Sequence, residues 1–195
     1  MPVSPMVRAA LTVSNLERSK AFYVDVLGLT EVFLDSAVEG GNMHALMGVP
    51  ASTRTRICIL KTPGSAAYGM VGLFELLDPA PPRIDFQGAG SLVGELCMVF
   101  YCPDLDAVLR EVEARRLVVV APPVPLEVRG RIKQREMTFR GPDGEKINLI
   151  EWDLARADAG ERPEKWSGAT AGSTLPTPAR DPIGGLSGPI TENWR

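Results

Sequence analysis

The chain has 195 residues, and 45% of them are hydrophobic, which is typical of a soluble globular protein with one large domain or two small fused ones. Lys and Arg number 21 against 24 Asp and Glu, for a net charge of -3, and this balance argues against sequence-independent nucleic-acid binding. The first residues, MPVSPMV, have neither the basic region nor the apolar core of a signal peptide, and no stretch requires a membrane span. We therefore expect a cytoplasmic protein without nucleic-acid or membrane partners.

The first regular segment is a strand followed at once by a helix. Apolar residues alternate through residues 7–13, which predicts the strand. Ser14 and Asn15 provide capping oxygens, and Glu17 stands three residues after Ser14, as in a capping box. Apolar residues then recur at helical spacing until Gly28, so we predict a helix that ends there.

Three further strands complete the first half of the chain. Residues 29–34, 55–61 and 71–77 are rich in aliphatic side chains and are bounded by turn-forming residues. Between the first two strands, residues 43–47 are predicted to form a short helical turn that carries His44, the single histidine of the chain. Histidine is the side chain whose ordinary pKa suits proton transfer at neutral pH.

A second strand–helix pair repeats the first. Residues 96–101 form the predicted strand, and Asp104 takes the cap position before an apolar helical face that runs from Leu105 to Val112. In this repeat Asp104 corresponds to Asn15. A repeat predicts two units that share a core, because one unit cannot bury both faces of its sheet. Two unrelated strand–helix pairs are the alternative.

The second half closes with a hairpin. Short strands are predicted at 118–120 and 126–128, and strands at 133–140 and 146–152 flank the turn sequence PDG. Proline and glycine mark the connection between the two halves. The predicted organisation is a first module at 1–78, a linker at 79–94, a second module at 95–152 and an extension at 153–195.

The composition of the extension changes to Ala, Gly, Pro, Thr and charged residues. This composition favours an extended or disordered segment. Isolated large apolar residues, such as Trp166 and Trp194, favour instead an arm that is anchored on its own domain or on a neighbouring subunit. Both interpretations stay open.

The segments LTVSNLERSKAFYVDVLGL and MTFRGPDGEKINLIEW resemble the vicinal oxygen chelate superfamily, which contains glyoxalases, bleomycin-resistance proteins and extradiol dioxygenases. The resemblance covers residues 7–152. It implies an α+β fold in which two paired βαβββ modules form a cup-shaped, incompletely closed barrel. It also implies activity inside the cup, where family members typically hold a divalent metal with four side chains, two from each module.

The four ligand positions implied by this resemblance depart from the family pattern. They fall on Arg8, Glu75, Cys97 and Asn148, of which Glu75 alone is a usual ligand. Arg8 has no lone pair to donate, and its positive charge repels a divalent cation. We therefore expect no cofactor, and a divalent metal at this position is disfavoured.

An Arg8–Glu75 pair is expected in place of the metal. One interpretation is a buried salt bridge without a catalytic role. The other is a site in which Arg8 binds a carboxylate, phenolate or enolate oxygen, Glu75 acts as general base and His44 as acid. Side-chain alternation along the strands also predicts a set of substrate-binding residues, namely Thr12, Cys97, Tyr101, Asn148 and Trp152.

Three functions stay open. The first is a metal-independent lyase or isomerase acting on a small, moderately hydrophobic oxo or aromatic compound, which the basic residues Arg8 and Lys146 favour. The second is a metal-free small-molecule binding or resistance protein of the bleomycin-resistance type. The third is a metal-dependent dioxygenase or glyoxalase with ligands at other positions. In each case the partner is a small molecule, and we expect a homodimer.

Overall fold

The computed structural model describes residues 3–38, 42–65, 67–84, 86, 90–128 and 131–154. The chain divides into two compact units, Met1–Pro163 and Glu164–Arg195, and the second unit lies outside the described residues, as does nearly all of the predicted extension. No helix in the described ranges is long and apolar enough to cross a membrane. The following description concerns the first unit.

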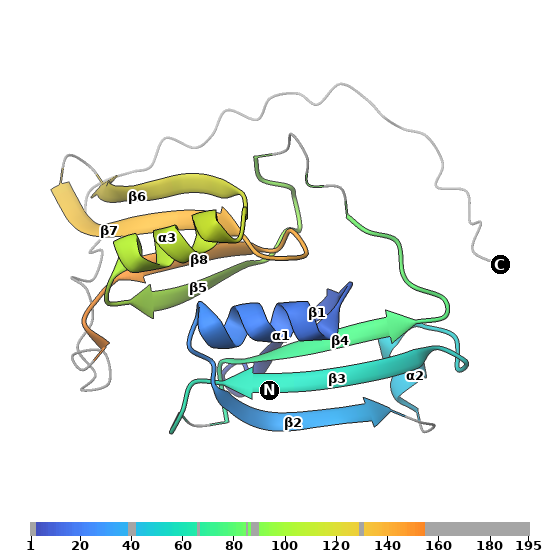
Figure 1. The fold of residues 1–195 in the computed structure, drawn as a ribbon. Coiled ribbons are helices and arrows are strands. Elements are labelled where there is room, and N and C mark those ends of the chain that lie inside the picture. The colour runs from blue at the N-terminus through green and yellow to red at the C-terminus, as the bar shows by residue number, and fades with distance from the viewer. Residues whose placement is uncertain are drawn as a thin grey trace, which may run out of the picture. The chain divides into compact units, whose positions relative to one another are not determined.

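The first half of this unit folds into one mixed sheet of four strands. Its strand order is β1-β4-β3-β2, in which β1 and β4 are parallel and the other pairs are antiparallel (Figure 1). Two helices accompany the sheet. The elements are β1 (Arg8–Val13), α1 (Leu16–Asp25), β2 (Glu31–Val38), α2 (Met43–Met47), β3 (Arg54–Lys61) and β4 (Met70–Leu77).

The second half repeats this topology. Its sheet has the order β5-β8-β7-β6, again with a parallel pair, β5 and β8, followed by two antiparallel pairs. The predicted internal repeat and the α+β class are confirmed, and the two sheets are not closed into a barrel. The elements are β5 (Cys97–Cys102), α3 (Leu105–Ala114), β6 (Val119–Val128), β7 (Arg131–Arg140) and β8 (Lys146–Glu151).

Both main helices begin at the predicted caps. The side chain of Asn15 accepts a hydrogen bond of 2.8 Å from the backbone N–H of Arg18, and Asp104 accepts one of 2.8 Å from Ala107. Each cap satisfies an N–H that has no partner within its own helix. The two strand–helix units therefore start their helices in the same way.

The predicted capping box at α1 is not formed. Ser14 lies one residue before the cap, and its hydroxyl donates a hydrogen bond to Asp143 in the β7–β8 turn. Glu17 is turned away from the cap and forms an ion pair with Arg56 on β3. Both side chains thus contact residues from distant segments of the chain instead of forming the local capping box.

One continuous strand, β6, replaces the two short strands predicted between residues 118 and 128. The prolines Pro122, Pro123 and Pro125 favoured an interruption, but β6 is the edge strand of its sheet. An edge strand tolerates residues without a backbone donor, because one side of it has no neighbour to pair with. Register shifts along β6–β7 accommodate the prolines.

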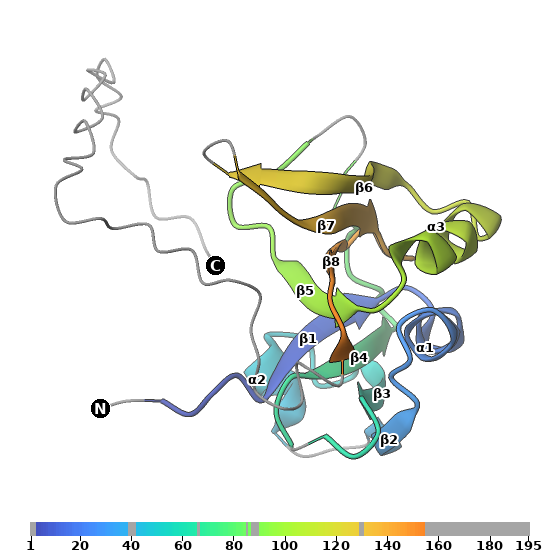
Figure 2. The same ribbon diagram turned by 90° about the vertical axis from the view of Figure 1, so that its left-hand side faces the viewer.

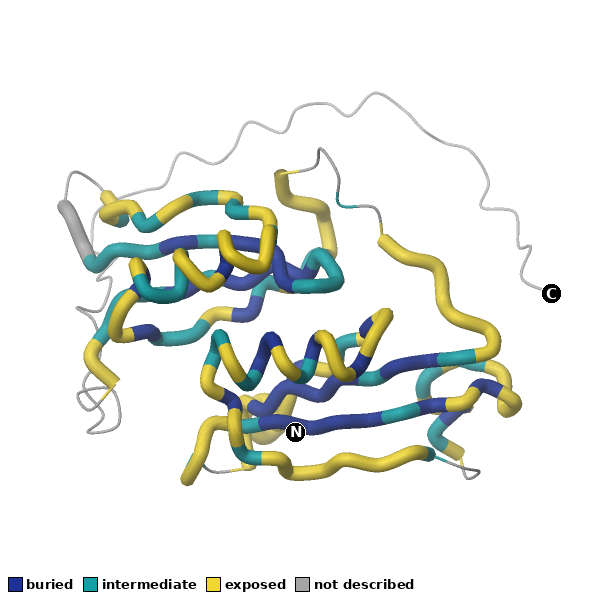
Figure 3. Tube along the Cα trace, in the orientation of Figure 1, coloured by how far each residue is buried: buried dark blue, intermediate teal, exposed yellow. Residues whose placement is uncertain are grey.

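Helices α1 and α3 lie on one side of the sheets, and α2 lies on the opposite side of the first sheet (Figure 2). Buried apolar residues of both modules belong to one core, which includes Leu73 from the first module and Leu149 from the second. The rings of Phe22 on α1 and Phe139 on β7 meet edge to face, with centroids 6.2 Å apart. Burial is greatest along β3 and β4, whereas most of β2 is exposed (Figure 3).

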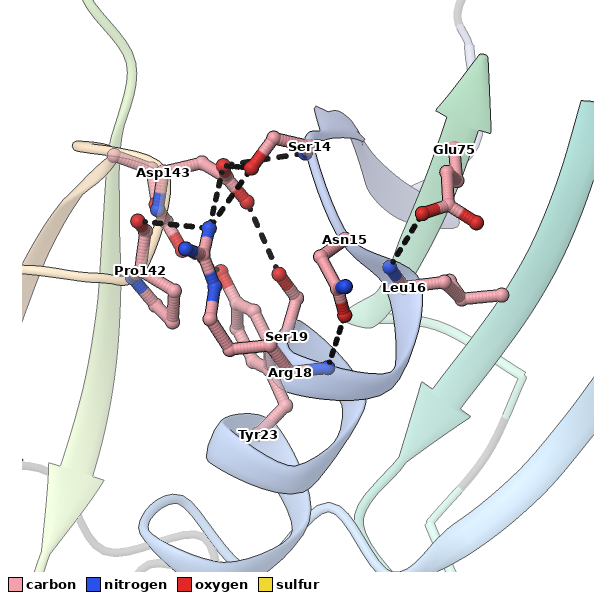
Figure 4. Close-up of polar contacts among 10 residues, drawn as sticks. Ser14, Asn15, Leu16, Arg18, Ser19, Tyr23, Glu75, Pro142 and Asp143 are labelled. Carbon is pink, nitrogen blue, oxygen red and sulfur yellow. Dashed lines mark hydrogen bonds and ion pairs between the residues drawn. The ribbon is translucent and has the colours of Figure 1, made fainter. Parts of the chain in front are cut away.

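A polar contact at one corner also joins the modules (Figure 4). The carboxylate of Asp143, in the turn between β7 and β8, accepts hydrogen bonds from Ser14 N (3.2 Å) and Ser14 Oγ (2.5 Å). It accepts two more from Arg18 Nη2 (2.8 Å) and Ser19 Oγ (3.0 Å), and Ser19 is fully buried. Asp143 therefore binds donors from the residue before the α1 cap and from two side chains at the start of the helix.

Replacing Asp143 by Ala should destabilise the fold by about 2–4 kcal/mol, because it leaves several donors, including buried Ser19, without a partner. Asp25→Ala is the matched control, since Asp25 also joins the modules, through an exposed ion pair of 3.3 Å with Arg115. That loss should cost less than about 1 kcal/mol. Denaturant unfolding measures both values, and equal losses would contradict the role given to Asp143.

Candidate functional site

Arg8 opens β1 and is exposed. It is paired in register with Met70, so its side chain lies on the same face as Gly72. A Cβ atom placed on Gly72 would lie 3.5 Å from Arg8 Cδ and 3.0 Å from Phe74 Cε2. The absence of a side chain at Gly72 thus lets Arg8 and Phe74 flank it. Among the described residues Arg8 has no ion-pair partner, and we call this surface, formed by Arg8, Thr12, Gly72 and Phe74, the Arg8 face.

Glu75 lies on the other face of the same sheet. Its register partner is Val13, a buried residue on the helix-covered side. The Glu75 carboxylate accepts a hydrogen bond of 3.2 Å from Leu16 N, at the start of α1 (Figure 4). It accepts another of 3.2 Å from Arg56 Nη1. The expected Arg8–Glu75 pair is therefore not formed. Arg8 is in register with Met70, and Glu75 lies five residues after Met70, so the side chains of Arg8 and Glu75 point to opposite faces of the sheet. Glu75 instead stabilises the N-terminus of α1.

His44 is a buried part of the first module. It lies on α2, only 5% of its surface is exposed, and its Nε2 is 2.6 Å from the carbonyl oxygen of Thr53. A carbonyl can only accept, so Nε2 carries a proton and donates it. This hydrogen bond holds α2 against the segment before β3.

The predicted residues of the second module do share a face. Tyr101 and Asn148 are both half-buried and lie on the side of β5 and β8 that also carries Cys97. The Asn148 amide donates hydrogen bonds to Thr138 Oγ1 (3.1 Å) and Glu136 Oε2 (3.3 Å) on β7. We call this surface the Asn148 face.

Two predicted residues lie at the margins of these surfaces. Thr12 is exposed on β1, paired in register with Phe74. Trp152 follows β8 and is half-buried, and its backbone N–H donates to Cys102 O at 2.9 Å, which extends the parallel pairing of β5 and β8. The structure thus distributes the predicted site residues over two separate surfaces.

Sequence reasoning did not identify a buried carboxyl group in the β7–β8 turn. Glu145 is 7% exposed and lines two cavities of about 400 and 470 Å³. Its Oε1 accepts a hydrogen bond of 2.9 Å from Tyr23 Oη, and its Oε2 accepts one of 2.9 Å from Asp143 N. Burial, reinforced by the charge of Asp143, raises the pKa of Glu145, and burial also raises the pKa of Tyr23. The position of this glutamate directly after the PDG turn was the one signal in the sequence, but its burial depends on packing against α1.

A model of the Glyoxalase/Bleomycin resistance protein/Dioxygenase superfamily matches residues 6–149 of the chain. The chain belongs to this superfamily. The resemblance that the two terminal motifs carry is thereby confirmed. No curated protein matches the chain.

Solved structures of the glyoxalase superfamily share the fold. A glyoxalase family protein of Bacillus cereus is 20% identical, with a TM-score of 0.61, and the match covers 77% of this chain and 95% of that one. A superfamily domain from Frankia is 17% identical, with a TM-score of 0.50 and coverage of 76% and 98%. A glyoxalase I variant of Zea mays is 14% identical, with a TM-score of 0.52 and coverage of 78% and 52%. These likenesses concern the fold alone.

The residues at the superfamily's metal positions do not fit a divalent cation. Arg8 occupies one position with a positive charge, and the carboxylate of Glu75 is bound to the start of α1 on the opposite face. Across the described ranges, no three His, Cys, Asp or Glu side chains lie close enough together to hold a metal ion. The chemistry of these surfaces must therefore be derived from the side chains themselves.

Glu145 should make stability fall as the pH rises. Its pKa is raised in the folded protein, so the unfolded chain releases the proton first and becomes relatively more stable once the pH exceeds the ordinary value of 4.5. The free energy of unfolding should therefore decrease as the pH rises from the ordinary pKa of a glutamate through the raised pKa of Glu145. In Glu145→Gln, the amide can accept from Asp143 N and donate to Tyr23 Oη, so this dependence should disappear.

Thermal unfolding of both proteins across mildly acidic to neutral pH measures the effect. The stability of the variant relative to the unmodified chain should increase with pH. Glu113→Gln, at an exposed position on α3, removes the same charge and should show a constant difference. A constant difference for Glu145→Gln as well would contradict the raised pKa.

Proposed function

We propose that this member of the glyoxalase superfamily binds a small, moderately hydrophobic acid, such as an aromatic or oxo acid, without a metal ion. The supporting observation is the exposed Arg8, which has no ion-pair partner in the described part of the chain and whose side chain flanks Gly72 together with the ring of Phe74. A guanidinium binds a carboxylate through two parallel hydrogen bonds, and an aromatic ring next to it provides a surface for the apolar part of the ligand.

Binding is favoured over catalysis because the two proton-transfer groups expected from the sequence have other roles. Glu75 is bound to Leu16 and Arg56 on the far face of the sheet, and His44 is bound to Thr53. A metal-independent lyase or isomerase is the second candidate. Its support is Glu136, a half-buried carboxylate on the Asn148 face that could accept a proton from a ligand.

We also propose a homodimer in the cytoplasm. Arg8 and Thr12 on the Arg8 face are exposed in one chain, and Val99, between Cys97 and Tyr101 on the Asn148 face, is 55% exposed. A second copy covering these surfaces would remove apolar area from water and enclose the ligand. All three cysteines are free, as is usual in a reducing compartment.

Arg8→Ala should weaken the binding of 2-naphthoate or phenylpyruvate by roughly ten- to a hundredfold, because a charge-assisted two-pronged contact is lost. Arg8→Lys should bind more tightly than Arg8→Ala and more weakly than the unmodified chain, since it keeps the positive charge but loses the two-pronged guanidinium contact. Calorimetric titration measures the affinities, and Arg110→Ala, at an exposed position on α3, is the matched control.

Equal affinity of Arg8→Ala and the unmodified chain would rule out the proposed site. The same samples distinguish the two candidate functions, because a binding protein returns the acid unchanged. Conversion of phenylpyruvate above its spontaneous rate, lost in Glu136→Gln, would identify a lyase or isomerase instead.

Light scattering after gel filtration should give twice the mass of the 195-residue chain. Val99→Arg should shift the protein to monomers, because it places an unpaired charge in the proposed contact. Val32→Arg on edge strand β2 is the matched control, since Val32 is similarly exposed and lies in the other sheet. A monomeric unmodified chain would contradict the proposal.

A further inference from the structure

The two cavities meet at one wall. Leu11 from β1, Ile84 and Phe86 from the linker, and Glu145 from the β7–β8 turn line both of them. The wall is therefore assembled from three segments that are distant in the sequence. Among the described residues, Glu145 is its one ionisable group.

The first cavity, of about 400 Å³, is otherwise apolar except for Glu95. That carboxylate is fully engaged by Arg140 (2.6 Å) and Lys146 (2.7 Å), which lower the pKa of Glu95 to about 2. None of the described residues that line this cavity is Lys, Arg or His. The remaining wall is formed by aliphatic and aromatic side chains, including Leu92, Val93 and Met98.

The carboxyl group of Glu145 is held in a fitted position. A Cβ atom on Gly141 would come within 2.2 Å of Glu145 Oε1, so the backbone of Gly141 leaves room for the carboxyl. Likewise a Cβ atom on Gly144 would lie 2.3 Å from Phe86 Cδ2, so this glycine admits the aromatic ring of the linker. Two glycines of one turn therefore make space for the polar and the aromatic part of the same wall.

Both hydrogen-bond donors to Glu145 are neutral, namely Tyr23 Oη and Asp143 N. Each carboxylate oxygen has a second lone pair, so the group can accept further hydrogen bonds. A buried carboxylate without a cationic partner is costly, and a ligand that brings a positive charge would remove that cost.

We propose that this cavity is a second ligand site, which takes a hydrophobic amine with its ammonium group on Glu145 and its apolar body against Leu11, Phe86 and Met98. The site includes neither Arg8 nor Phe74 and is independent of the function proposed for the Arg8 face. It differs from that face in charge preference, since the acids proposed for Arg8 would be repelled by Glu145.

The probe is 2-naphthylmethylamine, compared with the neutral 2-naphthylmethanol and the anionic 2-naphthoate. The amine should bind the full chain more tightly than the alcohol, and this difference should increase with pH as Glu145 loses its proton. Glu145→Gln should weaken amine binding by roughly ten- to a hundredfold and leave alcohol binding within about twofold. Glu113→Gln is the matched control for the loss of one charge and should bind the amine normally.

A second variant tests the location. Leu92→Trp enlarges a wall residue of the first cavity that is 38% exposed, so it should weaken the amine and the alcohol alike without touching Glu145. Circular dichroism and thermal unfolding establish that each variant is folded. Equal binding of amine and alcohol, or amine binding unchanged in Glu145→Gln, would overturn the proposal, whereas the result with 2-naphthoate and Arg8→Ala bears only on the Arg8 face.

Discussion

The carboxylate of Asp143 connects the two modules at the corner where β1 passes into α1. Its donors are Ser14, which precedes the cap of α1, and Arg18 and Ser19 on the helix. Two residues after Asp143, Glu145 accepts a hydrogen bond from Tyr23, which is also on α1. Together with the shared core, the β7–β8 turn thus joins the modules, and it carries the buried carboxyl that lines both cavities.

Alternation along the strands decides which chemistry each surface can perform. Arg8 and Glu75 belong to paired strands, yet their side chains lie on opposite faces of the sheet, so the guanidinium is open to solvent while the carboxylate serves the N-terminus of α1. The exposed cation makes the Arg8 face suitable for anions. The carboxylate on the far face strengthens the helix that carries Arg18 and Ser19, and thereby the contact with Asp143.

The superfamily shows how one architecture can support different chemistries once the side chains of its faces change. In this chain an arginine, a thiol and an amide stand at three of the four positions where the superfamily usually has metal ligands, and this set does not fit a divalent cation. The apolar cavity lined by Leu11 and Phe86 contains a carboxyl group, that of Glu145. With the anion site proposed at Arg8 and the amine site proposed at Glu145, one small domain would hold a ligand with both groups, or two ligands at once.

Local patterns in the sequence determined the order of strands and helices, the caps Asn15 and Asp104, the PDG turn and the repeat of two modules, because these depend on neighbours within a few residues. The superfamily followed from the same two motifs. Tertiary structure decided three features that local periodicity does not predict. These are the continuity of β6 at a sheet edge, the opposite faces of Arg8 and Glu75, and the burial of His44. It also decided the burial of Glu145, whose partner Tyr23 lies on a helix more than a hundred residues earlier. Register and burial arise from contacts between distant segments, and a pattern of neighbours along the chain does not specify them.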